Sequence, residues 1–167
     1  AAALDDQALA AVQAGTPYIG YGSNAMRSAV ELFADGALVY ETAGDSAMDA
    51  LSYVTYPTDS LITASYVAEG DDVLYGYGAG YFAAIPEGAQ VLVQLDSSKG
   101  LLEGFLPSTG DHYQDFLDDS IQAISYQGAG AGGAQLDVVL FANTLTNKVH
   151  QRDEFNFISN AAWAAVL

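Results

Sequence analysis

The strongest constraint on the fold lies in residues 16–25, whose sequence is TPYIGYGSNA. Pro17 forces an extended start, and the apolar residues after it predict a short buried strand. Two glycines then permit a tight turn, and Ser23 or Asn24 can cap the helix that follows. A strand, a tight turn and a helix start form the bend, here called the elbow, at which α/β proteins present a nucleophile or bind a phosphate.

The segments on either side of the elbow continue this pattern. Apolar residues recur at helical spacing from Leu4 to Val12, and the helix after the elbow is expected to end at Asp35-Gly36. A further strand is expected over Ala37–Tyr40. The order helix, strand, helix, strand implies a parallel α/β sheet.

The rest of the chain is predicted to be richer in strands. The expected strands cover residues 51–56, 73–77, 90–95, 121–126 and 136–142. The glycine-rich segment 128–133 predicts a flexible loop, and Asp153 predicts the cap of a last helix. No linker or internal repeat interrupts the pattern, so the sequence predicts one domain over residues 1–167.

Charge restricts the partners that the chain can take. Twenty-one acidic residues and four basic ones give a net charge of −17. This balance argues against nucleic acid and anionic membrane surfaces, and no apolar run approaches the length of a membrane span. The acidic side chains fit a solvated surface, a basic or peptide ligand, or loose cation binding. The absence of cysteine excludes disulfides, thiolate metal sites and a cysteine nucleophile.

The elbow lacks a reactive side chain at its tip. Aligned with the pattern apolar, Gly, apolar, Cys, x, Gly, its nucleophile position falls on Gly22. Ser23 is a poor substitute, because a serine elbow needs glycine where Tyr21 stands. The two histidines, His112 and His150, lie in no recognisable motif. No catalytic residue is therefore predicted, and a hydrolase that uses Ser23 with a histidine is the weaker interpretation.

A nucleotide site is the alternative function of the elbow. Gly20-x-Gly22-x-x-Ala25 fits a relaxed dinucleotide-binding pattern, and Glu41 follows about twenty residues later, where such sites hold a ribose. The candidate ligand-binding residues are then Gly20, Gly22, Ser23 and Asn24. The opposing interpretation is that the glycines only permit the tight bend.

Two other features of the sequence are candidate sites. The acidic pairs Asp5-Asp6, Asp71-Asp72 and Asp118-Asp119 have neither calcium-loop nor zinc-site spacing, so no metal site is predicted. The run from Tyr75 to Phe82 alternates aromatic residues with glycine. It suits either a carbohydrate or peptide contact surface or the packing of a curved sheet.

Several short segments carry a family resemblance. Residues 15–22 (GTPYIGYG) resemble the elbow region of class I glutamine amidotransferase-like domains, in a form that has lost the catalytic cysteine. Residues 84–92 (AIPEGAQVL) and 101–105 (LLEGF) are similar to the version attached to secreted bacterial zinc carboxypeptidases of the M14 type. Residues 138–141 and 157–162 are similar to the closing strand and helix of that version.

This resemblance implies a fold, a partner and a location. The fold is a flavodoxin-like three-layer sandwich with a mainly parallel sheet and extra strands in the middle. The chain, which opens on Ala1 rather than methionine, is then a piece of a longer extracellular or cell-envelope precursor. Its role is to pack against the peptidase domain or to contact substrate. The family's His-x-Glu pair has no match, so no catalytic residue carries over, and zinc is expected only in the peptidase domain.

Overall fold

The computed structural model describes residues 4–43, 49–64, 66, 72–77, 80–104, 118–146 and 155–167. The helices are α1 (Asp6–Gln13), α2 (Ser23–Val30), α4 (Phe155–Ala164) and a short 3₁₀ helix, η1 (Ala131–Gly133). The strands are β1 (Tyr18–Tyr21), β2 (Val39–Thr42), β3 (Asp49–Thr55), β4 (Val73–Tyr77), β5 (Gly80–Ala84), β6 (Gln90–Leu95), β7 (Leu101–Gly104), β8 (Ile121–Ala129) and β9 (Gln135–Phe141).

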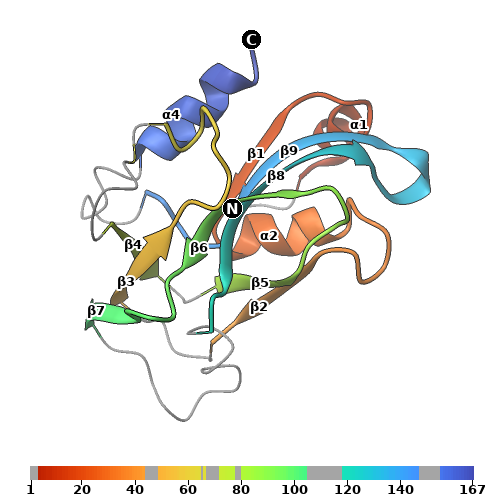
Figure 1. Ribbon diagram of the computed structural model, residues 1–167. Helices are drawn as coiled ribbons and strands as arrows, with labels where there is room; N and C mark the ends of the chain where they lie inside the picture. The colour runs from red at the N-terminus through yellow and green to blue at the C-terminus, as the bar shows by residue number, and fades with distance from the viewer. Residues whose placement is uncertain are drawn as a thin grey trace.

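The strands form one open sheet around which the helices pack (Figure 1). Its order is β1-β9-β8-β6-β3-β4, with β7 also on β3, and with β5 joining β8 to β2. Among the described strands only β1 and β9 run parallel, and every other pair is antiparallel. The mixed α/β class is confirmed. The prediction of a mainly parallel sheet is wrong, and the flavodoxin-like three-layer arrangement is not supported.

The connections between the strands explain why the sheet is mainly antiparallel. The strand after α2 does not return beside β1, because β2 pairs antiparallel with β5. The connection between β8 and β9 is too short for a crossover, so these strands can only form a hairpin. Helical and strand periodicity predict each element but not its neighbour in the sheet.

The β8–β9 hairpin is the longest regular pairing in the sheet and curves visibly away from the rest of it (Figure 1). Its register runs from Ala123 opposite Phe141 to Ala129 opposite Gln135. The prediction of a flexible loop from residue 128 is therefore wrong, because Gly128 and Ala129 extend β8. The turn beyond them uses positive φ at Gly132 and Gly133, which glycine adopts without strain.

Both faces of β9 are buried, each against a different helix. Leu136, Val138 and Leu140 belong to a cluster that contains residues of α2, among them Met26. Phe141 belongs to a second cluster with Phe157 of α4, and Val139 packs partly against it. Successive residues of a strand point to opposite faces, so the nearly continuous apolar run of β9 supplies both clusters.

A buried polar network joins the end of β9 to β5. The Asn143 side chain accepts a hydrogen bond from Gly80 N at 3.0 Å and donates one to Gly80 O at 3.1 Å. Its Nδ2 also donates to Gln122 Oε1 at 2.6 Å, and Gln122 Nε2 donates to Ser120 Oγ at 2.7 Å. Asn143 thereby takes the place of a strand partner for Gly80, and its amide is fully satisfied in the core.

We expect Asn143→Ala to destabilise the fold by about 2–5 kcal/mol, because it leaves both Gly80 backbone groups and Gln122 Oε1 buried without partners. Urea unfolding followed by circular dichroism measures the change. The matched control is Asn24→Ala at an exposed position, which should change stability by less than about 0.5 kcal/mol. Equal effects of the two substitutions would contradict a structural role for the network.

Tyr40 lies beside this network, and its ring packs edge-on against Phe82 with centroids 6.3 Å apart. Burial raises the pKa of the Tyr40 hydroxyl to about 12, and the positive charge of Arg27 lowers it in part. An ordinary tyrosine in the unfolded chain ionises near pH 10, so the unfolded state loses this proton first. The stability that Tyr40 contributes is complete below pH 10 and is lost as the pH rises towards 12.

We therefore expect Tyr40 to contribute a late ionisation step, near pH 12, in an alkaline titration monitored by phenolate absorbance. In Tyr40→Phe this late step should be missing, and the loss of stability above pH 10 should be shallower. An unchanged titration curve above pH 11 in the variant would show that Tyr40 is not the buried group.

Candidate functional site

The structure confirms the strand, turn and helix of the elbow. β1 ends at Tyr21, Gly22 turns the chain, and α2 begins at Ser23. Gly22 has φ 78° and ψ 162°, a region that is essentially restricted to glycine. Its N–H donates to Phe141 O at 3.1 Å, and its carbonyl accepts from Met26 N at 3.0 Å. Both backbone groups of Gly22 are therefore used within the protein.

The two glycines of the elbow are needed for packing. A Cβ on Gly22 would lie 2.6 Å from Thr144 Oγ1, so the tip of the elbow is filled by a side chain from the segment after β9. A Cβ on Gly20 would lie 3.0 Å from Met26 Cε, so this glycine lets α2 approach β1 closely. Thr144 was missed by the sequence analysis, since no local pattern links it to a turn far away in the chain.

Ser23 and Asn24 lie exposed at the start of α2. The prediction that one of them caps the helix is wrong, because Gly22 occupies the cap position and no side chain caps the helix there. The elbow thus presents two exposed polar side chains beside a closed tip. His112, His150 and Asp153 lie outside the described residues.

Glu41 is not positioned as a dinucleotide site requires. It lies on β2 opposite Tyr81 of β5, whereas the sheet neighbour of β1 among the described strands is β9. Glu41 instead lines a hollow of about 500 Å³ with Asp118 and Asp119. Hydrogen bonds from Ser97 lower the pKa of Asp119. Within the described ranges no three His, Cys, Asp or Glu side chains are placed to hold a metal ion.

We expect Gly22→Ala to destabilise the protein by about 2–4 kcal/mol, because it adds backbone strain and a contact with Thr144. The matched control is Gly36→Ala, since Gly36 also has positive φ (74°) but nothing within 4 Å of an added Cβ. The control should lower the free energy of unfolding only by the backbone strain, about 1 kcal/mol. Equal costs in thermal unfolding would show that Thr144 does not fill the tip.

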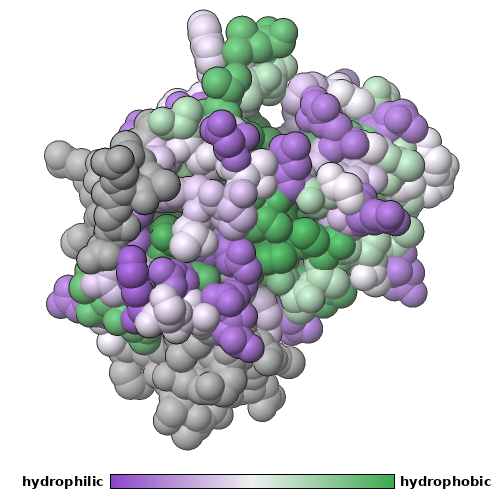
Figure 2. All heavy atoms as spheres, in the orientation of Figure 1, coloured by the Kyte–Doolittle hydropathy of each residue, from purple (hydrophilic) through white to green (hydrophobic). Residues whose placement is uncertain are grey.

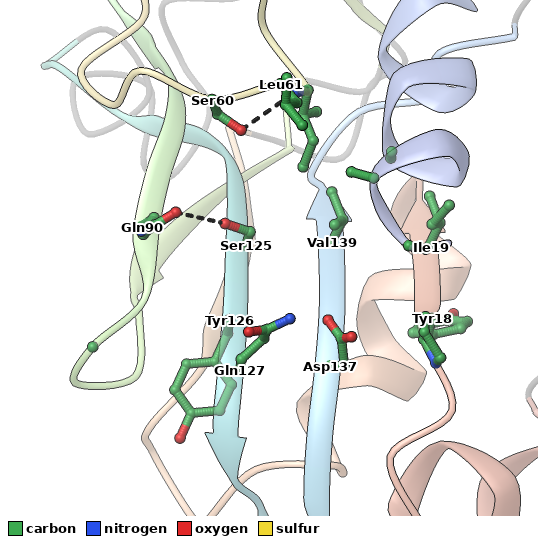
Figure 3. A pocket seen from close by; sticks show the side chains of 16 residues that line it. Tyr18, Ile19, Ser60, Leu61, Gln90, Ser125, Tyr126, Gln127, Asp137 and Val139 are labelled. Atoms are coloured by element: carbon green, nitrogen blue, oxygen red, sulfur yellow. Dashed lines mark hydrogen bonds between the residues drawn. The ribbon is translucent and has the colours of Figure 1, made fainter. Parts of the chain in front are cut away.

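A second candidate site lies on the other face of the sheet, between the sheet and α4. It is a groove of about 460 Å³ (Figure 3). Its floor contains one row of directly paired residues across four strands: Ile19 of β1, Val139 of β9, Ser125 of β8 and Gln90 of β6. The neighbouring row of the floor contains Gln127 opposite Asp137.

The walls of the groove come from two segments that are tied together. One wall is the turn at residues 60–62, where Ile62 N donates to Ser60 Oγ at 3.2 Å. The other is α4 with the residue after it, and it contributes Ala161, Ala164 and Ala165. Asn160 Nδ2 donates to Ile62 O at 3.1 Å and so joins the two walls. The small alanine side chains leave the groove open where α4 faces β1.

The groove is polar at one end and apolar at the other. Gln127 and Asp137 point towards one another at the polar end, and Ser125 Oγ donates to Gln90 Oε1 at 3.4 Å (Figure 3). None of the described residues that line the groove is basic. The two basic residues of the described chain act elsewhere, Arg27 near Tyr40 and Lys99 with Asp96 Oδ2 at 3.8 Å. The carboxylate of Asp137 is thus the charge that a ligand would meet.

The aromatic run that was considered as a contact surface is divided in the structure. It falls on β4 and β5, with residues 78 and 79 outside the described part. Tyr81 and Phe82 are buried, each 3% exposed, so these two side chains pack the core. Exposed hydrophobic side chains occur instead near the end of α4, where Trp163, Val166 and Leu167 are 66–81% exposed and the chain end projects (Figure 2).

Comparison with models of protein families gives no match to this sequence, and comparison with curated proteins gives none either. Among the described helices, none has the length and apolar character needed to cross a membrane.

Proposed function

We propose that this chain is a non-catalytic accessory domain that contacts a peptide ligand through the groove beside α4. The observation that carries the proposal is the contrast between its two candidate sites. The elbow is closed by Gly22 and Thr144. The groove is open, has one polar and one apolar end, and contains a carboxylate. The volume of the groove lies within the range that is usual for ligand sites, about 300–1,000 Å³, in which polar groups fix the orientation of the ligand.

The same proposal includes a longer protein of which this chain is one domain. The resemblance to the amidotransferase-like domains of secreted zinc carboxypeptidases supports a precursor outside the cytoplasm, with a peptidase domain as the partner in the same chain. In that setting the groove would hold a segment of the substrate, or of the peptidase domain itself. Any zinc chemistry would then belong to the peptidase domain.

Nucleotide binding or hydrolysis at the elbow is the competing function. A pyrophosphate there would need free amides at the start of α2 and an acidic residue on the adjacent strand. The amide of Gly22 already donates to Phe141 O, and Glu41 lies on a strand that pairs with β5. These two observations favour the groove over the elbow.

Thermal unfolding with added ligands tests the proposal. The ligands are NAD, ATP and a tryptic digest of casein, and turnover of a nitrophenyl ester is followed in parallel. We expect a saturable rise in melting temperature with the digest, and neither stabilisation by nucleotide nor ester turnover.

Ser23→Pro is the variant that separates the two sites. Proline is tolerated at the first position of a helix, and here it removes the amide and hydroxyl of Ser23 without touching the groove. The variant should keep the response to the digest. Stabilisation by a nucleotide, or ester turnover, that disappears in Ser23→Pro would overturn the accessory function.

A further inference from the structure

We infer that the groove selects extended peptides that carry a basic side chain and, two residues away, a large apolar one. The inference rests on the proposed function, since it names the ligand of the same groove. Three features of the groove carry it: the isolated carboxylate, the spacing between its two ends, and the amide side chains along its floor.

Charge selects the basic side chain. Asp137 is partly buried on the floor, and no hydrogen bond or ion pair of its carboxylate is found within the described part of the chain. Its direct cross-strand neighbour, Gln127, is neutral. Since no basic side chain among the described residues lines the groove, a lysine or arginine of a ligand can supply the charge that pairs with Asp137. The net charge of −17 also attracts cationic ligands at long range.

Geometry selects the spacing. Asp137 and Val139 are alternate residues of β9, so their side chains leave the same face about 7 Å apart. Side chains two residues apart in an extended peptide have the same separation. A peptide that lies along β9 with its basic side chain on Asp137 places the next side chain of that face over Val139 and Ile19. There Ile62 and the alanines of α4 complete an apolar pocket.

The floor also offers partners for the backbone of such a peptide. Ser125 and Gln127 lie on β8, next to β9, and Gln90 lies one strand farther away, on β6. Glutamine amides both donate and accept, so they can pair with peptide N–H and C=O groups without selecting a sequence. Sequence preference then comes from the carboxylate and the apolar pocket.

The test titrates the intact, isotopically labelled chain with three probes and follows its amide resonances. The probes are acetyl-Gly-Lys-Gly-Leu-Gly-amide, its glutamine analogue at the lysine, and its glycine analogue at the leucine. We expect the first probe to shift amides of residues 125–127 and 137–139 and to bind about three- to tenfold more tightly than either analogue. The advantage over the glutamine analogue should shrink in high salt.

Two variants and a control assign the preference to Asp137. Asp137→Asn keeps the shape and should remove the difference between the lysine and glutamine probes, while Asp35→Asn, an exposed site after α2, should leave it intact. Gln127→Lys places a cation directly opposite Asp137, so it should weaken binding of the lysine probe without loss of thermal stability.

The outcomes separate the inference from the proposed function. If all probes shift the groove amides with equal affinity, or if Asp137→Asn preserves the lysine preference, the inference is wrong and the groove remains a peptide site. If no probe shifts these amides, the inference is also wrong. The proposed function fails only if, in addition, the casein digest gives no stabilisation or a nucleotide binds at the elbow.

Discussion

The pairing of β9 with two neighbours of opposite direction determines the rest of the architecture. β9 runs parallel to β1 and antiparallel to β8, so it joins the elbow and α2 to the antiparallel part of the sheet. Its alternate side chains complete one core with α2 and a second with α4. A polar residue at a buried position such as Val138 would disrupt the packing of one core. A one-residue shift in the register of β9 would exchange the side chains of its two faces.

The end of β9 explains why the elbow is closed. Within four residues, Phe141 accepts the hydrogen bond of Gly22, Asn143 pairs with the backbone of Gly80, and Thr144 fills the space over the turn. The carboxyl ends of parallel strands are where α/β proteins place their ligands, but here that position is occupied by packing and hydrogen bonds. The groove lies instead on the α4 face of the sheet, where the small side chains of Ala161, Ala164 and Ala165 leave the floor partly uncovered.

The sequence predicted local structure better than it predicted pairing. The elbow, the strand over residues 136–142 and the last helix follow from proline, glycine and apolar periodicity, which act over a few residues. The prediction of a parallel sheet was wrong for two reasons: β2 pairs antiparallel with β5 through contacts that no local pattern records, and the short connection between β8 and β9 allows only a hairpin. Thr144 and the groove were not foreseen because Ile19 lies more than a hundred residues before Ser125 and Asp137, and these residues come together only through the register of the sheet.

The central claim is that ligands meet this protein at the face beside α4 and not at the elbow. A crystal structure of the intact chain, grown with both ATP and a lysine-containing peptide present, tests it most directly. The account predicts peptide density along β9 with its ammonium group on Asp137, and an empty helix start. Nucleotide density against Ser23 and Asn24, with Thr144 displaced from Gly22 and no peptide in the groove, would contradict it.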